Sequence, residues 1–184
     1  VPLENWKERP SQYQSRFKVA YSKNAFYVLF DCEDKQLSCT NLKDFDNLYE
    51  EDVVEFFLWP DKTQRVYFEH ETSPLGAELP ITVINTDHEF MGCRPWHYEG
   101  ERRCTVKTQV RGGPCEPGAQ VEGWYAEIRM PFALLQGLGN RLPKKGDRWR
   151  ANFYRIDYDQ EKPVQFMWSP VRMREFGFHD REKF

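Results

Sequence analysis

Apolar residues recur along this chain with a period of two, which is typical of β-strands. In the segment 53–59, apolar side chains fall on both faces, with Val53, Phe57 and Trp59 on one and Val54, Phe56 and Leu58 on the other. Glu55 is the exception, because it places a carboxylate on an otherwise apolar face. Burying a carboxylate is costly unless it is hydrogen-bonded, so Glu55 is expected to support either the structure or a ligand.

Similar alternation predicts further strands, which are separated by turn residues. We expect a hairpin from 16–21 and 25–32, and strands near 64–71, 81–84, 104–110, 122–130, 148–157 and 165–169. Segments 35–49 and 85–98 show little periodicity and are expected to be irregular, whereas 131–135 suits a single helical turn. The pattern therefore predicts an all-β fold, an antiparallel β-sandwich with one short helix, forming a single domain over residues 1–184.

The composition excludes several classes of function. The chain of 184 residues has a net charge of −3, and its basic residues are scattered, so a nucleic-acid surface is not expected. It contains no stretch of the roughly 20 apolar residues that a membrane-spanning helix needs. Aromatic residues make up 16% of the chain, a content expected of a β-rich core and also of proteins that stack on sugars.

The five cysteines leave two interpretations open, because their spacing matches no zinc motif. Cys32 could be linked to Cys39 and Cys104 to Cys115, which would leave Cys93 unpaired. Alternatively, all five are free and partly buried thiols.

Histidines and tryptophans show no pattern that requires a special role. The histidines lack the close spacing of metal ligands and are expected to be structural or exposed: His70, His88, His97 and His179. Four tryptophans lie within strand patterns and are expected in the core: Trp59, Trp124, Trp149 and Trp168.

Acidic runs are the remaining candidate chemistry. Three of them could supply oxygen ligands for calcium, although none has the spacing of a defined calcium loop: Asp31/Glu33/Asp34, Asp44/Asp46 and Glu50/Glu51/Asp52. Solvated charge is the alternative interpretation. We find no nucleophile motif, phosphate-binding loop or metalloprotease pattern, so we do not expect an enzyme.

Several segments, taken in order, resemble the family 9 carbohydrate-binding modules and their bacterial relatives. They read NAFYVLFDCED at 24–34, YEEDVVEFFLWPD at 49–61, GWYAEIRMPFALL at 123–135, GDRWRANFYRIDYD at 146–159, WSPV at 168–171 and FGFHDREKF at 176–184. The resemblance covers roughly residues 16–184, and it implies a β-sandwich with bound calcium.

The resemblance also implies a binding site in which two aromatic rings hold a sugar. Tyr49 and Phe178 match the two rings, and Glu55 and Asn152 match polar side chains that bond the sugar hydroxyls. This chain departs from the family at two further places. Glu69 stands near a family arginine, and Glu175 occupies a polar position of the tail.

The resemblance implies a non-catalytic domain, exported by a bacterium, that binds a mono- or oligosaccharide in polysaccharide capture or degradation. A glycoside hydrolase is the expected partner enzyme, and the expected location is extracytoplasmic. One alternative is an interaction or scaffold domain whose sugar site has decayed, as the two glutamate departures suggest. Another is a b-type haem-binding sandwich, whose axial ligands would be Met91 with His88 or Met173 with His179.

Overall fold

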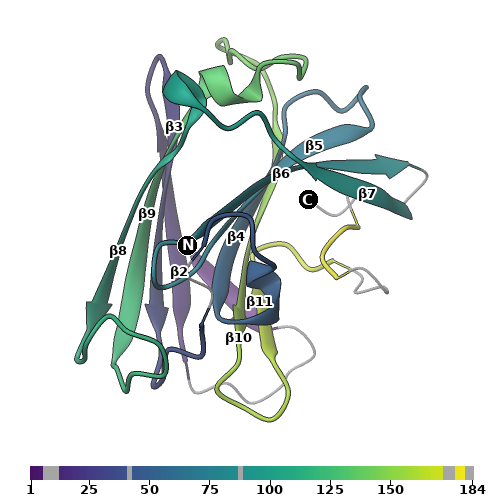
Figure 1. The fold of residues 1–184 in the computed structure, drawn as a ribbon. Helices are drawn as coiled ribbons and strands as arrows, with labels where there is room; N and C mark the ends of the chain where they lie inside the picture. Colours follow the sequence, from purple (N-terminus) through teal and green to yellow (C-terminus); the bar gives the residue numbers. More distant parts are fainter. Residues whose placement is uncertain (6–12, 41–42, 87–88, 172–176, 181–184) are drawn as a thin grey trace.

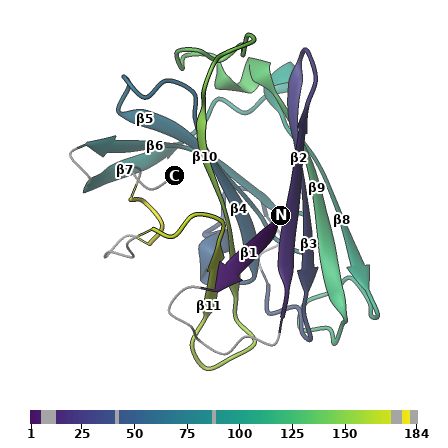
Figure 2. The same cartoon turned by 180° about the vertical axis from the view of Figure 1, so that it is seen from behind.

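Two antiparallel sheets lie face to face and are joined through one short strand, β1 (Figures 1 and 2). The computed structural model describes residues 1–5, 13–40, 43–86, 89–171 and 177–180. The predicted antiparallel β-sandwich is therefore confirmed for this part of the chain.

The six-stranded sheet has the order β7 (Glu89–Pro95), β6 (Glu78–Thr86), β5 (Val66–Thr72), β4 (Val53–Trp59), β10 (Arg150–Asp157) and β11 (Val164–Met167). The five-stranded sheet has the order β1 (Pro2–Asn5), β2 (Ser15–Tyr21), β3 (Ala25–Glu33), β9 (Gly123–Pro131) and β8 (Thr105–Arg111). Three short 3-10 helices are η2 (Leu48–Glu50), η3 (Gly100–Arg102) and η4 (Phe132–Leu135).

Most predicted elements occur where they were expected. Strands β2 and β3 form the predicted hairpin, and η4 is the predicted helical turn. The prediction was wrong for the segment 85–98, which contains strand β7. Strand β7 pairs with β6 through a register shift between Ile84 and Asn85, and such an irregularity breaks the period that a sequence pattern can reveal.

All five cysteines are free thiols, which agrees with the second of the two interpretations. Cys32, Cys39 and Cys104 are buried, whereas Cys115 is exposed. Within the described residues, no helix combines the length and apolar character needed to cross a membrane.

Strand β4 is buried on both faces, and this determines how the outer face of its sheet is used. Its inward residue Phe56 belongs to the core between the two sheets. Its outward residue Phe57 packs in a second cluster with Leu48 of η2 and with Val171 and Phe178. Helix η2 and the described C-terminal residues 177–180, here called the C-terminal segment, therefore cover part of the outer face of the six-stranded sheet (Figure 1).

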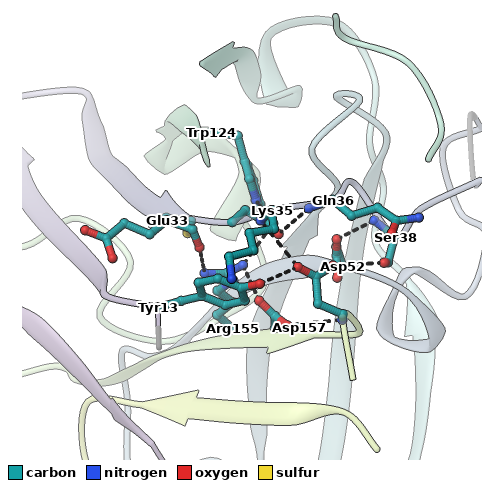
Figure 3. A network of polar contacts seen from close by, with 12 residues as sticks. Tyr13, Glu33, Lys35, Gln36, Ser38, Asp52, Trp124, Arg155 and Asp157 are labelled. Carbon is teal, nitrogen blue, oxygen red and sulfur yellow. Dashed lines mark hydrogen bonds and ion pairs between the residues drawn. The ribbon is translucent and has the colours of Figure 1, made fainter. Parts of the chain in front are cut away.

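A buried arginine, Arg155 on β10, connects the two sheets (Figure 3). Its guanidinium donates to Ser15 Oγ at 3.0 Å and to the Glu33 carbonyl at 2.6 Å, both on the five-stranded sheet. It also donates to the carboxylates of Asp34 at 2.9 Å and Asp157 at 2.5 Å. Because a buried charge needs a partner, these contacts hold β10 against β2 and β3.

More carboxylates surround Arg155 than one cation can neutralise. Asp34 also accepts from Trp124 Nε1 at 3.0 Å, and Asp52 accepts from the backbone N–H groups of Ser38 and Tyr158. Burial raises the pKa of Asp34 to about 8 and that of Asp52 to about 7, although Arg155 opposes both shifts. The fold therefore depends on this arginine for charge balance.

Replacing Arg155 with methionine is expected to lower the free energy of unfolding by about 3–5 kcal/mol, because the buried Asp34 and Asp157 would lose their partner. Urea unfolding followed by circular dichroism measures this change. The matched control is Lys18→Met, which removes an exposed charge on β2 and should change stability by no more than about 0.5 kcal/mol. A loss below about 1 kcal/mol for Arg155→Met would contradict the role assigned to the arginine.

Candidate functional site

The four residues predicted to bind a sugar lie on or beside the outer face of the six-stranded sheet. Glu55 and Asn152 are buried on β4 and β10, whose pairing places Asn152 opposite Phe57. Tyr49 lies on η2, and 45% of its surface is exposed. Phe178 lies in the C-terminal segment that covers the same face.

Phe178 already uses one face of its ring within the protein. The ring stacks on Tyr154, with 4.2 Å between centroids and 17° between planes. Only 4% of its surface is exposed, and its carbonyl accepts a hydrogen bond from the Tyr154 hydroxyl at 3.5 Å. Phe178 is thus a packed residue of the covering segment, and a sugar clamp between Tyr49 and Phe178 stays a prediction.

Asn152 holds the chain that follows β11. Its Nδ2 donates to the Ser169 carbonyl at 2.8 Å, and its Oδ1 accepts from the Ser169 backbone N–H at 3.0 Å. The Phe153 N–H also donates to Oδ1, at 2.9 Å. This anchoring role could not be found from the strand pattern, because Ser169 meets Asn152 only through the fold.

Three glutamates form a buried row on the outer face. Strand pairing places Glu55 on β4 opposite Glu71 on β5, and Glu69 precedes Glu71 by two residues on the same face. All three side chains are buried. The sequence analysis singled out Glu55 and Glu69 as candidate site residues but not Glu71, because the row arises only from the pairing register of β4 and β5.

Burial raises the pKa of all three glutamates well above the ordinary range, and their mutual repulsion adds to the effect. The backbone N–H of Tyr49 donates to Glu71 and opposes the shift there. Within the described residues, one oxygen each of Glu69 and Glu71 accepts no hydrogen bond. Protonated carboxyl groups both donate and accept hydrogen bonds, which is the chemistry that sugar hydroxyls require.

His179 lies beside Glu69 of this row. Its ring stacks on Phe57 at 5.3 Å, bonds the Tyr67 hydroxyl through Nδ1, and lies 3.8 Å from a carboxylate oxygen of Glu69. Burial lowers the pKa of His179 to about 4, so the ring is neutral near pH 7. The C-terminal segment therefore adds a neutral polar ring to a surface that otherwise carries acids.

The haem interpretation gains no support from these residues. The His179 ring already bonds the Tyr67 hydroxyl and stacks on Phe57, and Met91 is exposed on β7. The other residues of the two pairs, His88 and Met173, lie outside the described residues, as does Glu175.

The oxygen-rich cluster Asp34, Asp157 and Asp159 does not fit a calcium ion. Arg155 already contacts the first two carboxylates as their cation. Asp159 accepts from the Tyr13 hydroxyl at 2.8 Å and from Ser38 Oγ at 3.2 Å. Because protein donors satisfy these oxygens, calcium binding by the chain stays a prediction that this cluster does not support.

A cavity of about 700 Å³ lies away from the glutamate row. It is lined chiefly by apolar residues of β2, β3, β4 and β10 and of the segment after β11, and its polar side chains are Arg150 and Ser169. Trp149 and Trp168 both line it. Trp168 is 46% exposed, so the prediction of a core position was wrong for this residue. The cavity offers apolar contact but few partners for hydroxyl groups.

Replacing Glu55 with glutamine is expected to flatten the pH dependence of stability. The folded state retains a proton on Glu55 that the unfolded state, with its ordinary pKa of 4.5, releases in mild acid. Stability should therefore fall as pH rises above this ordinary value, and the variant should lose part of this fall. Urea unfolding at several pH values measures it, with the exposed Glu127→Gln on β9 as control. Equal slopes for wild type and Glu55→Gln would contradict the buried row.

Comparison with known proteins gives the family. The sequence profile described as carbohydrate-binding family 9 matches residues 1–184. A Bacteroides uniformis protein proposed to bind carbohydrate superposes with a TM-score of 0.75 at 20% identity, covering 100% of this chain and 82% of that one. A family 9 module from Caldicellulosiruptor kristjanssonii, solved with cellotriose and with glucose, superposes with a TM-score of 0.58 at 17% identity, covering 88% of this chain and 68% and 70% of those chains. The curated proteins contain no match. As its motifs indicated, the chain belongs to carbohydrate-binding family 9.

Proposed function

We propose that this chain is a non-catalytic module that binds a neutral sugar on the outer face of its six-stranded sheet. The site would lie between Tyr49 of η2 and the C-terminal segment at Phe178, with the glutamate row as its floor. The observation that carries the proposal is this row of three buried acids beside an exposed aromatic ring, in a chain of carbohydrate-binding family 9.

The chemistry of the row suits a sugar better than most other ligands. A pyranose presents a C–H face that packs on an aromatic ring, and Tyr49 offers such a ring at the edge of the site. Its hydroxyls need both donors and acceptors, and the buried Glu69 and Glu71 have oxygens that the described residues leave without a donor. An anionic sugar would need a cation to pair with, which these carboxyl groups do not supply, so we propose a neutral sugar.

The relatives suggest which neutral sugar to test first. The Caldicellulosiruptor kristjanssonii module was solved with glucose and with cellotriose, so glucose and its β-linked oligomers are the first candidates here. Such binding would serve the capture of polysaccharide outside the cytoplasm, in association with a glycoside hydrolase. Glu55, together with the amide of Asn152, would complete the polar contacts.

One observation favours a second candidate, an interaction domain whose sugar site has decayed. Phe178 stacks on Tyr154 and is almost fully buried, so the protein already uses the aromatic ring that would form one wall of a clamp. Under this alternative the outer face would bind no sugar, and the glutamate row would have only a structural role.

Calorimetric titration with glucose and cellotriose distinguishes the two. The module should bind at least one of them, and Tyr49→Ala should weaken binding by about 1–3 kcal/mol, or about 5- to 150-fold, as expected for loss of an aromatic anchor. The matched control is Tyr21→Ala, which removes a tyrosine 80% exposed on β2 of the opposite sheet and should leave binding unchanged. The absence of binding at millimolar sugar, or a Tyr49→Ala variant that binds normally, would favour the interaction domain.

A further inference from the structure

A second group of side chains, on the inner side of the six-stranded sheet, has the composition of a metal site. His70 on β5, Glu78 on β6 and Cys104 just before β8 bring a ring nitrogen, a carboxylate oxygen and a sulfur within 4.8 Å of one another. All three residues are buried. His70 alternates along β5 with Glu69 and Glu71, so this group faces the interior, away from the proposed sugar site.

The ligand chemistry favours zinc over the hard cations. A thiolate, an imidazole and a carboxylate are the three side-chain ligand types that zinc binds, whereas calcium and magnesium prefer oxygen alone. One thiolate and one carboxylate would also balance the two charges of the ion.

The distances are compatible with three corners of a tetrahedral site, whose fourth position a water molecule would fill. His70 Nε2 and a carboxylate oxygen of Glu78 are 3.0 Å apart. Donor atoms around zinc lie about 3.3–3.6 Å apart, a value that follows from the usual zinc–ligand bond lengths. Bringing the Cys104 sulfur from 4.8 Å or less into this range requires a shift on the order of 1 Å, which a rotation of its side chain can supply.

The surrounding residues hold the ligands in place as outer partners of a metal site do. The second ring nitrogen of His70, Nδ1, lies 3.3 Å from Thr72 Oγ1, and the ring stacks on Phe56 at 5.2 Å. The Tyr98 hydroxyl donates to Glu78 and accepts from the Cys104 backbone N–H at 2.8 Å. Such outer contacts fix the tautomer and orientation of metal ligands.

An ion could enter through the connection between β7 and β8, which crosses one end of the sandwich and contains η3 (Figure 1). Helix η3 has no buried residues, so it can move at little cost in packing. Arg103 follows it, lies over the Tyr98 ring at 5.2 Å and pairs with Asp44 at 3.2 Å.

We propose that His70, Glu78 and Cys104 form a zinc-binding site that joins the two sheets. Zinc bound there would connect β5 and β6 of the six-stranded sheet to the start of β8 in the five-stranded one. Its role would be structural, and it would stabilise the sandwich without touching the sugar. The spacing of these residues along the chain hides the site, because each ligand comes from a different strand or connection.

Cobalt and zinc titration of the intact, chelator-treated protein tests the proposal. We expect one equivalent of Co²⁺ to give a thiolate-to-cobalt charge-transfer band, and zinc to displace it. Zinc at about 100 times its Kd should raise the Tm by about 5–10 °C. Cys104→Ser should abolish the band and the Tm shift, whereas the control Cys93→Ser, which alters a half-buried thiol on β7, should keep both.

A second variant distinguishes a loss of zinc binding from a loss of the fold. Glu78→Gln retains a side chain that can bond His70 and Tyr98, but it should weaken zinc binding at least tenfold while circular dichroism shows the native fold. The absence of a charge-transfer band, or zinc binding by Cys104→Ser equal to that of wild type, would overturn the proposal. The group would then be only a buried histidine–glutamate pair.

Discussion

A single buried guanidinium holds the two sheets of this sandwich together near the end of β10. Arg155 bonds the backbone of β3, the Ser15 hydroxyl of β2 and two carboxylates at once. Because each contact requires a defined donor geometry, these hydrogen bonds position β10 relative to β2 and β3. Tyr154, next to Arg155 on the opposite face, then takes the position on which Phe178 stacks. The stacking of Phe178 on the outer face therefore depends on the position of β10, which the contacts of Arg155 on the inner face help to set.

Covering of the outer face explains why β4 is apolar on both sides. A sandwich sheet usually leaves one face to solvent, with polar residues along it. Here η2 and the C-terminal segment cover that face, and the polar groups that remain are mostly acids. Acids gathered under a partial cover are protonated more readily than exposed ones. We therefore propose that neutral carboxyl groups beside Tyr49 recognise the sugar, rather than an arginine, which this chain lacks near the position of Glu69.

The fold could be predicted from the sequence because period-two patterns and turn residues are local signals. The sequence patterns missed β1 and also β7, which pairs with β6 through a register irregularity, and they gave no sign that Trp168 lines a cavity. The family could be identified from the order of its motifs. Side-chain partnerships could not be predicted, since Glu71 faces Glu55, and Ser169 meets Asn152, only through strand register and chain folding. His70 and Cys104 are likewise joined by topology alone.

The location of the bound sugar tests the central claim most directly. In a ¹⁵N-labelled sample titrated with cellotriose, the backbone amide signals of Tyr49, Glu55 and Glu71 should move together and saturate with one affinity. The amides around the cavity at Trp149 and Trp168 should remain in place. Shifts confined to that cavity, or the absence of any shift at millimolar sugar, would contradict the assignment of the site to the outer face of the six-stranded sheet.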